Sequence, residues 1–264
     1  MAQNPLFNEK AFERAQAAQQ RGFRTSQDEF TQEPMHLVRG EDTADNAMTL
    51  QGTINKTFFL LFLCVAGGVI SWSHPQHWVP FLWLIALGAL GIAIWTGFKP
   101  IVARFTAPIY AVLEGLLLGA ISALYNAQFE GIVFNAVAIT FLVFAIMLML
   151  YCFKIVRVTS GLIKAVASAT LAIAVLYMGS WILSLFGVNP SYLTSSSPLS
   201  IGISIVVCIV AAANFLLDFE FINQMTSTYA VPKYMEWYAG FSLLVTLIWL
   251  YLEILRLLGK TRRR

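Results

Sequence analysis

Charged residues are scarce in this chain of 264 residues: Asp, Glu, Lys and Arg make up 12% of it, whereas hydrophobic residues make up 58%. Soluble domains contain roughly 25% charged and about 45–50% apolar residues. The mean hydropathy of +0.70 agrees with this excess of apolar residues. The composition therefore excludes a soluble domain. We expect the lipid bilayer as the main partner and no nucleic acid.

The sequence also lacks the motifs of the common catalytic and cofactor sites. All three cysteines lie within apolar runs without a pairing pattern, so no disulfide framework is expected. All three histidines lie outside the apolar runs, which leaves no Ser–His pair within a membrane. A zinc-protease motif, a phosphate-binding glycine loop and a metal-spaced Cys/His cluster are missing. We therefore expect neither an enzyme nor a bound cofactor.

The first 50 residues contain no apolar run, so they do not resemble a cleavable signal. We predict that residues 1–50 form a polar, disordered cytoplasmic tail. The first hydrophobic helix would then direct insertion, and residues 51–264 would form a single transmembrane domain.

Seven apolar segments follow this tail, each close to the ~20 residues that cross a ~30 Å hydrocarbon core. They cover residues 53–72, 79–97, 106–126, 131–153, 162–186, 199–221 and 237–258. Lipid leaves no partner for unpaired backbone groups, so each segment is expected to be helical. The sequence thus predicts an all-α fold, a polytopic bundle of about seven transmembrane helices.

Basic residues near the segments predict the orientation, because they favour the cytoplasmic side. One side collects Arg39, Lys56, Lys99, Arg104, Lys154, Arg157 and Lys233, and the opposite loops lack Lys and Arg. The N-terminus is therefore predicted to be cytoplasmic. The basic C-terminal end conflicts with seven crossings, so either the last segment is re-entrant or this tail is exported. Because residues 241–258 contain neither Gly nor Pro, we favour seven crossings.

Among the acidic residues within the apolar runs, Glu114, Asp218 and Glu253 are the candidates for a functional role, because a charge there costs at least ~2.5–3.5 kcal/mol. Glu114 precedes Gly115, and Gly115 and Gly119 have the spacing that lets two helices approach closely. We expect a buried or functional role for Glu114, rather than a carboxyl at the membrane interface.

The other two acids have stronger competing interpretations. Asp218 closes the sixth segment, with Asn214 one turn earlier on the same face. It is either a functional acid or a carboxylate at the interface. Glu253 is either functional or simply paired with Arg256, three residues later in the same helix.

Two carboxyl groups close together in a low-dielectric bundle cannot both ionise cheaply, so one of them titrates nearer to neutral pH. Such a pair can share a proton when it is closed and separate when both groups are charged. Ionised carboxylate oxygens are also the ligands that Ca²⁺ prefers. Acidic positions in these helices are therefore consistent with a pH-sensitive cation pathway.

Three stretches resemble the Bax inhibitor family (transmembrane Bax inhibitor motif), in its bacterial YccA-like branch. Residues 108–122 resemble the third-helix region, 214–219 the sixth-helix aspartate motif and 249–254 the last-helix motif. The resemblance covers roughly residues 50–260 and leaves the tail outside. It implies a seven-helix bundle with the last helix central, and a pH-sensitive Ca²⁺ leak in which two buried acids form a latch.

Residue by residue, the resemblance assigns the first latch acid to Asp218 and the second to Glu253, with calcium passing near both. Lys99 lies near a position where the family can carry a supporting Arg. If Asp218 and Glu253 lie at different depths, Glu114 is the alternative partner.

Together with the acids in the apolar runs, the resemblance implies a pH-sensitive calcium leak channel in a bacterial inner membrane. Asp218, Glu253 and Glu114 are its predicted pathway acids, and Asn214, Arg256 and Lys99 support them. One alternative is an interaction protein that modulates a membrane protease or a stress response without transport. A second alternative is a secondary transporter. The sequence does not predict an oligomeric state.

Overall fold

The computed structural model describes residues 47–187, 195–227 and 231–263. Residues 1–46 of the predicted disordered tail lie outside the described residues. The described helices are α3 (Leu50–Ser73), α4 (Pro75–Trp78), η1 (Val79–Phe81), α5 (Leu82–Phe98), η2 (Pro100–Val102), α6 (Ala103–Gln128), α7 (Ile132–Cys152), α8 (Ser160–Leu185), α10 (Pro198–Ser227) and α11 (Met235–Arg262).

Local sequence explains where several of these helices begin and end. The Thr49 hydroxyl caps α3 by accepting from the Gly52 amide, and Thr159 caps α8 in the same way. Pro100 disfavours the helical conformation of Lys99, which ends α5. Gly131 has a φ of 73°, which a residue with a side chain rarely adopts, and it makes the turn into α7.

Seven segments of the described chain are long and apolar enough to cross a membrane, and they match the seven predicted ones. Their outer surface carries large exposed hydrophobic side chains, such as Phe62, Trp83, Phe98 and Phe134. Soluble monomers rarely expose so much apolar surface, so this surface faces lipid. The predicted helical membrane bundle is confirmed.

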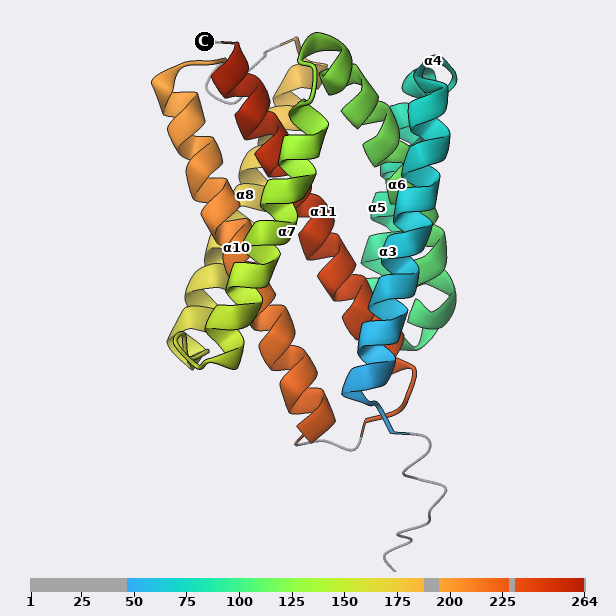
Figure 1. The fold of residues 1–264 in the computed structure, drawn as a ribbon, viewed down its shortest axis with the longest axis vertical. Coiled ribbons are helices and arrows are strands. Elements are labelled where there is room, and N and C mark those ends of the chain that lie inside the picture. The colour runs from blue at the N-terminus through green and yellow to red at the C-terminus, as the bar shows by residue number, and fades with distance from the viewer. Residues whose placement is uncertain (1–46, 188–194, 228–230, 264) are drawn as a thin grey trace, which may run out of the picture. The chain divides into compact units, whose positions relative to one another are not determined.

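The last helix, α11, lies at the centre of the bundle. It crosses between α7, α8 and α10 on one side and α3, α5 and α6 on the other (Figure 1). Leu250, Leu255 and Ile254 belong to a core shared with α7 and α10, whereas Leu244 and Ile248 belong to a core shared with α3 and α6. The predicted central position of the last helix is thus confirmed.

Helix α11 is also continuous over 28 residues, or ~42 Å at 1.5 Å per residue. Its first turn contacts the start of α3, and its last turn contacts the α6–α7 connection, where Arg262 donates to the Glu130 carbonyl at 2.8 Å. A re-entrant segment would return to the end at which it began. The geometry therefore fits seven crossings.

Glycines bring α3 and α6 unusually close together. A Cβ atom added at Gly115 would lie 2.1 Å from the Cys64 carbonyl oxygen, and one at Gly119 would lie 2.1 Å from that of Gly68. No side chain fits at such distances, so the two backbones are in direct contact. The predicted close approach at Gly115 and Gly119 is present, with α3 as the partner helix.

Candidate functional site

Asp218 joins α10 to the central helix. Its carboxylate accepts hydrogen bonds from the Ser242 hydroxyl at 2.5 Å and the Thr246 hydroxyl at 2.6 Å. These two donors lie one turn apart on α11, so they present both hydroxyls on one face. The two carboxylate oxygens thus receive one donor each across the contact of α10 with α11.

Asn214 lies one turn before Asp218 on α10 and bonds to α8. Its amide donates to the Thr170 hydroxyl of α8 at 2.9 Å and to the Val210 carbonyl at 2.8 Å. Asn214 therefore ties α10 to α8, and its support of Asp218 stays a prediction.

Glu253 lies in a separate polar cluster between α8 and α11. Its side chain is almost fully buried and accepts from the Tyr177 hydroxyl at 3.0 Å and from Arg256 at 3.0 Å. Arg256 also donates to the Tyr177 oxygen at 2.8 Å, which closes a triad of three side chains. The in-helix pair of Glu253 with Arg256 is therefore present, together with a tyrosine that the sequence did not suggest.

The two predicted latch acids do not contact each other in this structure. Thr246, which binds Asp218, and Glu253 are separated by seven residues of α11, or ~10 Å along the helix axis. Each acid has its own donors on α11 or α8. Because α10 and α11 run antiparallel, residues equally distant from their connection face each other, and this rule pairs Asp218 with Ser242 and Thr246.

Glu114 lies at the α3–α6 interface. It interacts with Tyr110, one turn earlier on α6, and lies near Cys64 of α3. The Tyr110 ring packs edge-on against Phe241 of α11, with ring centroids 5.0 Å apart. Because Phe241 adjoins Ser242, Glu114 lies at a similar level of the bundle to Asp218, with α11 between them.

Lys99 lies at the exposed end of α5. Its ammonium group lies 5.9 Å from the centroid of the Trp95 ring. Among the described residues, the ion pairs are Lys56–Glu236 and Arg256–Glu253. The structure therefore does not bring Lys99 to an acid.

Two buried charged groups were not predicted from the sequence. The first is Glu236, which lies just before the predicted start of the last segment at residue 237. Glu236 is fully buried and accepts from Lys56 and from the Thr49 amide at 3.0 Å and hydroxyl at 2.9 Å. It thereby locks the start of α11 onto the N-terminus of α3. The sequence signal that could have indicated this contact is a glutamate directly before an apolar run.

Lys260 is the second missed group and lies near the other end of α11. It is 6% exposed and donates to the Ser204 hydroxyl at 2.8 Å and to the Ser200 carbonyl at 3.3 Å. In the sequence it adjoins the arginines at the C-terminus and is therefore taken as part of the basic tail. The central helix therefore carries buried polar contacts along its whole length, to α3, α10 and α8.

No preformed metal centre is visible in the part of the chain that the structure describes. No group of three or more His, Cys, Asp or Glu side chains lies close enough there to hold an ion. Asp218 and its two donors offer one carboxylate and two hydroxyls, which is a poor set for tight Ca²⁺ binding.

A comparison with protein families identifies the family of this chain. The sequence model described as Bax inhibitor 1 like matches residues 4–263. The match begins at residue 4, so it extends further into the tail than the resemblance over residues 50–260. No match was found among curated proteins. With its seven apolar helices, the chain is an integral membrane protein of the Bax inhibitor 1-like family.

Proposed function

We propose that this protein is a pH-sensitive leak channel for cations, Ca²⁺ in particular, and that Asp218 gates it. The observation that supports this most is the contact of a largely buried carboxylate on α10 with two hydroxyls of the central helix. Intramembrane acids usually mark ion or proton pathways, because burying them without a function is costly.

The hydrogen bonds suggest how protonation acts on the gate. An ionised carboxylate offers two acceptor oxygens, and Ser242 and Thr246 donate to both. A protonated carboxyl is neutral and has one hydroxyl in place of an acceptor oxygen, so both donors lose their charged partner and one of them also loses its acceptor. Hydrogen bonds to charged groups contribute about 1.5–3 kcal/mol each, and acidification therefore loosens the α10–α11 contact by an amount of this order.

Glu114 and Glu253 are the further acids of the proposed pathway: Glu114 of α6 lies beside the central helix, and Glu253 belongs to it. Glu114 lies across α11 from Asp218, and its carboxylate can offer oxygen ligands to a cation at the same level. Glu253 is held by Arg256 and Tyr177, so it positions the second half of α11 against α8. In this proposal Asp218 and Glu253 act as two separate contacts of α11, in place of a single two-acid latch.

The distribution of basic residues supports a cytoplasmic N-terminus in a bacterial inner membrane. Lys56, Lys99, Lys154 and Lys233 lie at or near the end of the bundle where α3 begins, whereas the turns at the other end lack Lys and Arg up to the C-terminal helix. The basic C-terminus then lies on the far side, where Arg262 and Arg263 bond to the α6–α7 connection.

Calcium release from loaded liposomes tests this function. We expect purified protein to release Ca²⁺ faster at pH 6 than at pH 8. This sign is the reverse of the two-acid latch, which closes when its shared proton is bound, because here protonation weakens the bonds of Asp218 to Ser242 and Thr246. In Asp218→Asn, an amide replaces the titrating group, and the pH response should disappear. Glu130→Gln removes a carboxylate from an exposed turn and serves as the matched control, with an unchanged pH response.

Three outcomes would contradict the proposal. A pH response that persists in Asp218→Asn would exclude this residue as the gate. The absence of flux at any pH, together with a stable partner protein, would favour the interaction protein. Flux that saturates with substrate would favour the transporter.

A further inference from the structure

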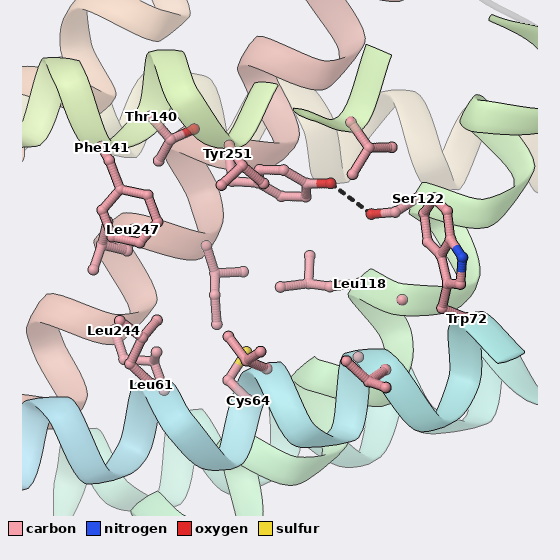
Figure 2. A pocket seen from close by; sticks show the side chains of 17 residues that line it. Leu61, Cys64, Trp72, Leu118, Ser122, Thr140, Phe141, Leu244, Leu247 and Tyr251 are labelled. Atoms are coloured by element: carbon pink, nitrogen blue, oxygen red, sulfur yellow. Dashed lines mark hydrogen bonds between the residues drawn. The ribbon is translucent and has the colours of Figure 1, made fainter. Parts of the chain in front are cut away.

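A pocket of about 460 Å³ lies between α3, α6, α7 and α11, and the proposed leak does not use it. Its walls include Leu61 and Cys64 of α3, Leu118 and Ser122 of α6, Thr140 and Phe141 of α7, and Leu244, Leu247 and Tyr251 of α11 (Figure 2). These segments all belong to helices long and apolar enough to cross the membrane. The pocket therefore lies at the depth of the lipid chains.

The hydroxyl groups in the wall already have partners within the protein. The Ser122 and Tyr251 hydroxyls bond to each other at 2.6 Å (Figure 2). The Thr140 hydroxyl donates to the Ala136 carbonyl at 2.7 Å. The surface offered to an occupant is consequently almost entirely hydrocarbon. A polar ligand would lose its hydration there without gaining hydrogen bonds.

The pocket is continuous with the lipid-facing surface. Val65 and Val69 of α3 and Phe141 of α7 line it and are exposed by 56%, 61% and 45%, whereas Leu244 and Cys64 at its inner wall are buried. An occupant can therefore enter sideways from the bilayer, between α3 and α7.

Its dimensions suit a lipid chain. Leu61 and Trp72 both line it, and they are ~16 Å apart along α3, close to the ~15 Å depth of one leaflet. A single hydrocarbon chain, with carbon contacts at ~4 Å, needs ~250–320 Å³ over this length, which the pocket of about 460 Å³ accommodates.

We propose that this pocket binds one acyl chain of a membrane lipid from the leaflet next to the α3–α4 turn. Trp72 lies at the end of α3, where an indole ring favours the headgroup layer. The bound chain runs inward from Trp72 towards Leu61 and Leu244, and it packs against the central helix.

Photo-crosslinking tests the site with a phosphatidylcholine that carries a diazirine on its sn-2 acyl chain. The full chain is reconstituted with this lipid as a trace component, irradiated and mapped by mass spectrometry. We expect adducts concentrated on the pocket residues of α3 and α7, above those around Val206 and Ile209 on the lipid-facing side of α10.

A pocket-filling variant and a matched control complete the test. Val65→Trp places an indole in the mouth of the pocket and should reduce its adducts about tenfold, equivalent to ~1.4 kcal/mol of binding. Val175→Trp, at a similarly exposed position on α8 outside the pocket, should leave them unchanged. The adducts at α10 should be the same in both variants, which shows that each remains folded in the membrane.

Two results would overturn the proposal. Pocket adducts no more frequent than those at α10, or unchanged in Val65→Trp, would mean that no chain is held there. A photoreactive amino acid at Val137 that crosslinks to another protein in native membranes would show that a partner protein occupies the site.

Discussion

The direct contact between the backbones of α3 and α6 makes Gly115→Ala a demanding test of the fold. The added Cβ would lie 2.1 Å from the Cys64 carbonyl oxygen and 3.0 Å from its Cα. Both atoms belong to a helical backbone, so no side-chain rotation can relieve the overlap. Ordinary contact begins near 3.4 Å, and the two helices must therefore part by more than an ångström.

The size of the effect follows from overpacking a tightly packed interface. Such substitutions cost about 1–3 kcal/mol, and the rigid backbone on both sides puts this one near the upper end. The higher helix propensity of alanine offsets at most ~1 kcal/mol. Gly202→Ala on α10 is the matched control, because a Cβ there meets nothing within 4 Å, so it should be neutral or slightly stabilising.

The free energy of unfolding in mixed micelles, measured by titration with SDS, provides the assay. We expect Gly115→Ala to unfold at a lower SDS fraction than the parent chain, and Gly202→Ala at the same or a higher one. Equal stability of Gly115→Ala and the parent chain would refute the close packing of α3 on α6.

Three further predictions address other contacts. Lys56→Met removes a charged donor from the buried Glu236 carboxylate and should lower the free energy of unfolding by about 1.5–3 kcal/mol. The loss is limited to this one bond because the two Thr49 donors remain. An unchanged midpoint of unfolding in SDS would argue against this pair. Tyr177→Phe deprives both Glu253 and Arg256 of a partner and should destabilise the protein by about 1 kcal/mol or more in the same assay, whereas Tyr234→Phe should not. In a chain whose native cysteines are replaced, Cys residues introduced at Glu130 and Arg263 should react with a membrane-impermeant maleimide from one side, and Cys residues at Lys99 and Lys154 from the other; labelling of all four from one side would contradict seven crossings.

Most of the fold could be predicted from the sequence, because lipid restricts the choices. Long apolar runs in a membrane must become helices, and the turn residues between them set their number. The close approach at Gly115 was also predictable, since only small residues let helix backbones touch. The identity of its partner helix was not, because many helix faces in an apolar bundle look equally suitable.

The candidate site was predicted only in part. The sequence singled out Asp218, Glu253 and Glu114 because charges in apolar runs are conspicuous. It did not identify Ser242 and Thr246, because hydroxyl groups are common in transmembrane helices and do not stand out in an apolar run as charges do. Counting residues from the α10–α11 connection would have placed them opposite Asp218, whereas the motif resemblance placed Glu253 there.

Glu236 and Lys260 were missed for a different reason. Both lie at the ends of the last helix, where a charged residue is usually taken to mark the limit of the membrane segment. The structure instead buries both against α3 and α10. Tertiary contacts at helix ends depend on which neighbour lies there, and the hydropathy pattern contains no information on this.

The double variant Ser242→Ala with Thr246→Val tests the central claim most directly, because it removes both donors and leaves Asp218 in place. Its Ca²⁺ leak from liposomes at pH 8 is measured beside that of Thr226→Val, which loses a hydroxyl bonded only within α10. The account predicts that the double variant leaks at pH 8 as fast as the parent chain does at pH 6, whereas Thr226→Val behaves like the parent. A folded double variant that stays closed at pH 8 and still opens at pH 6 would contradict gating through the contact of Asp218 with the central helix.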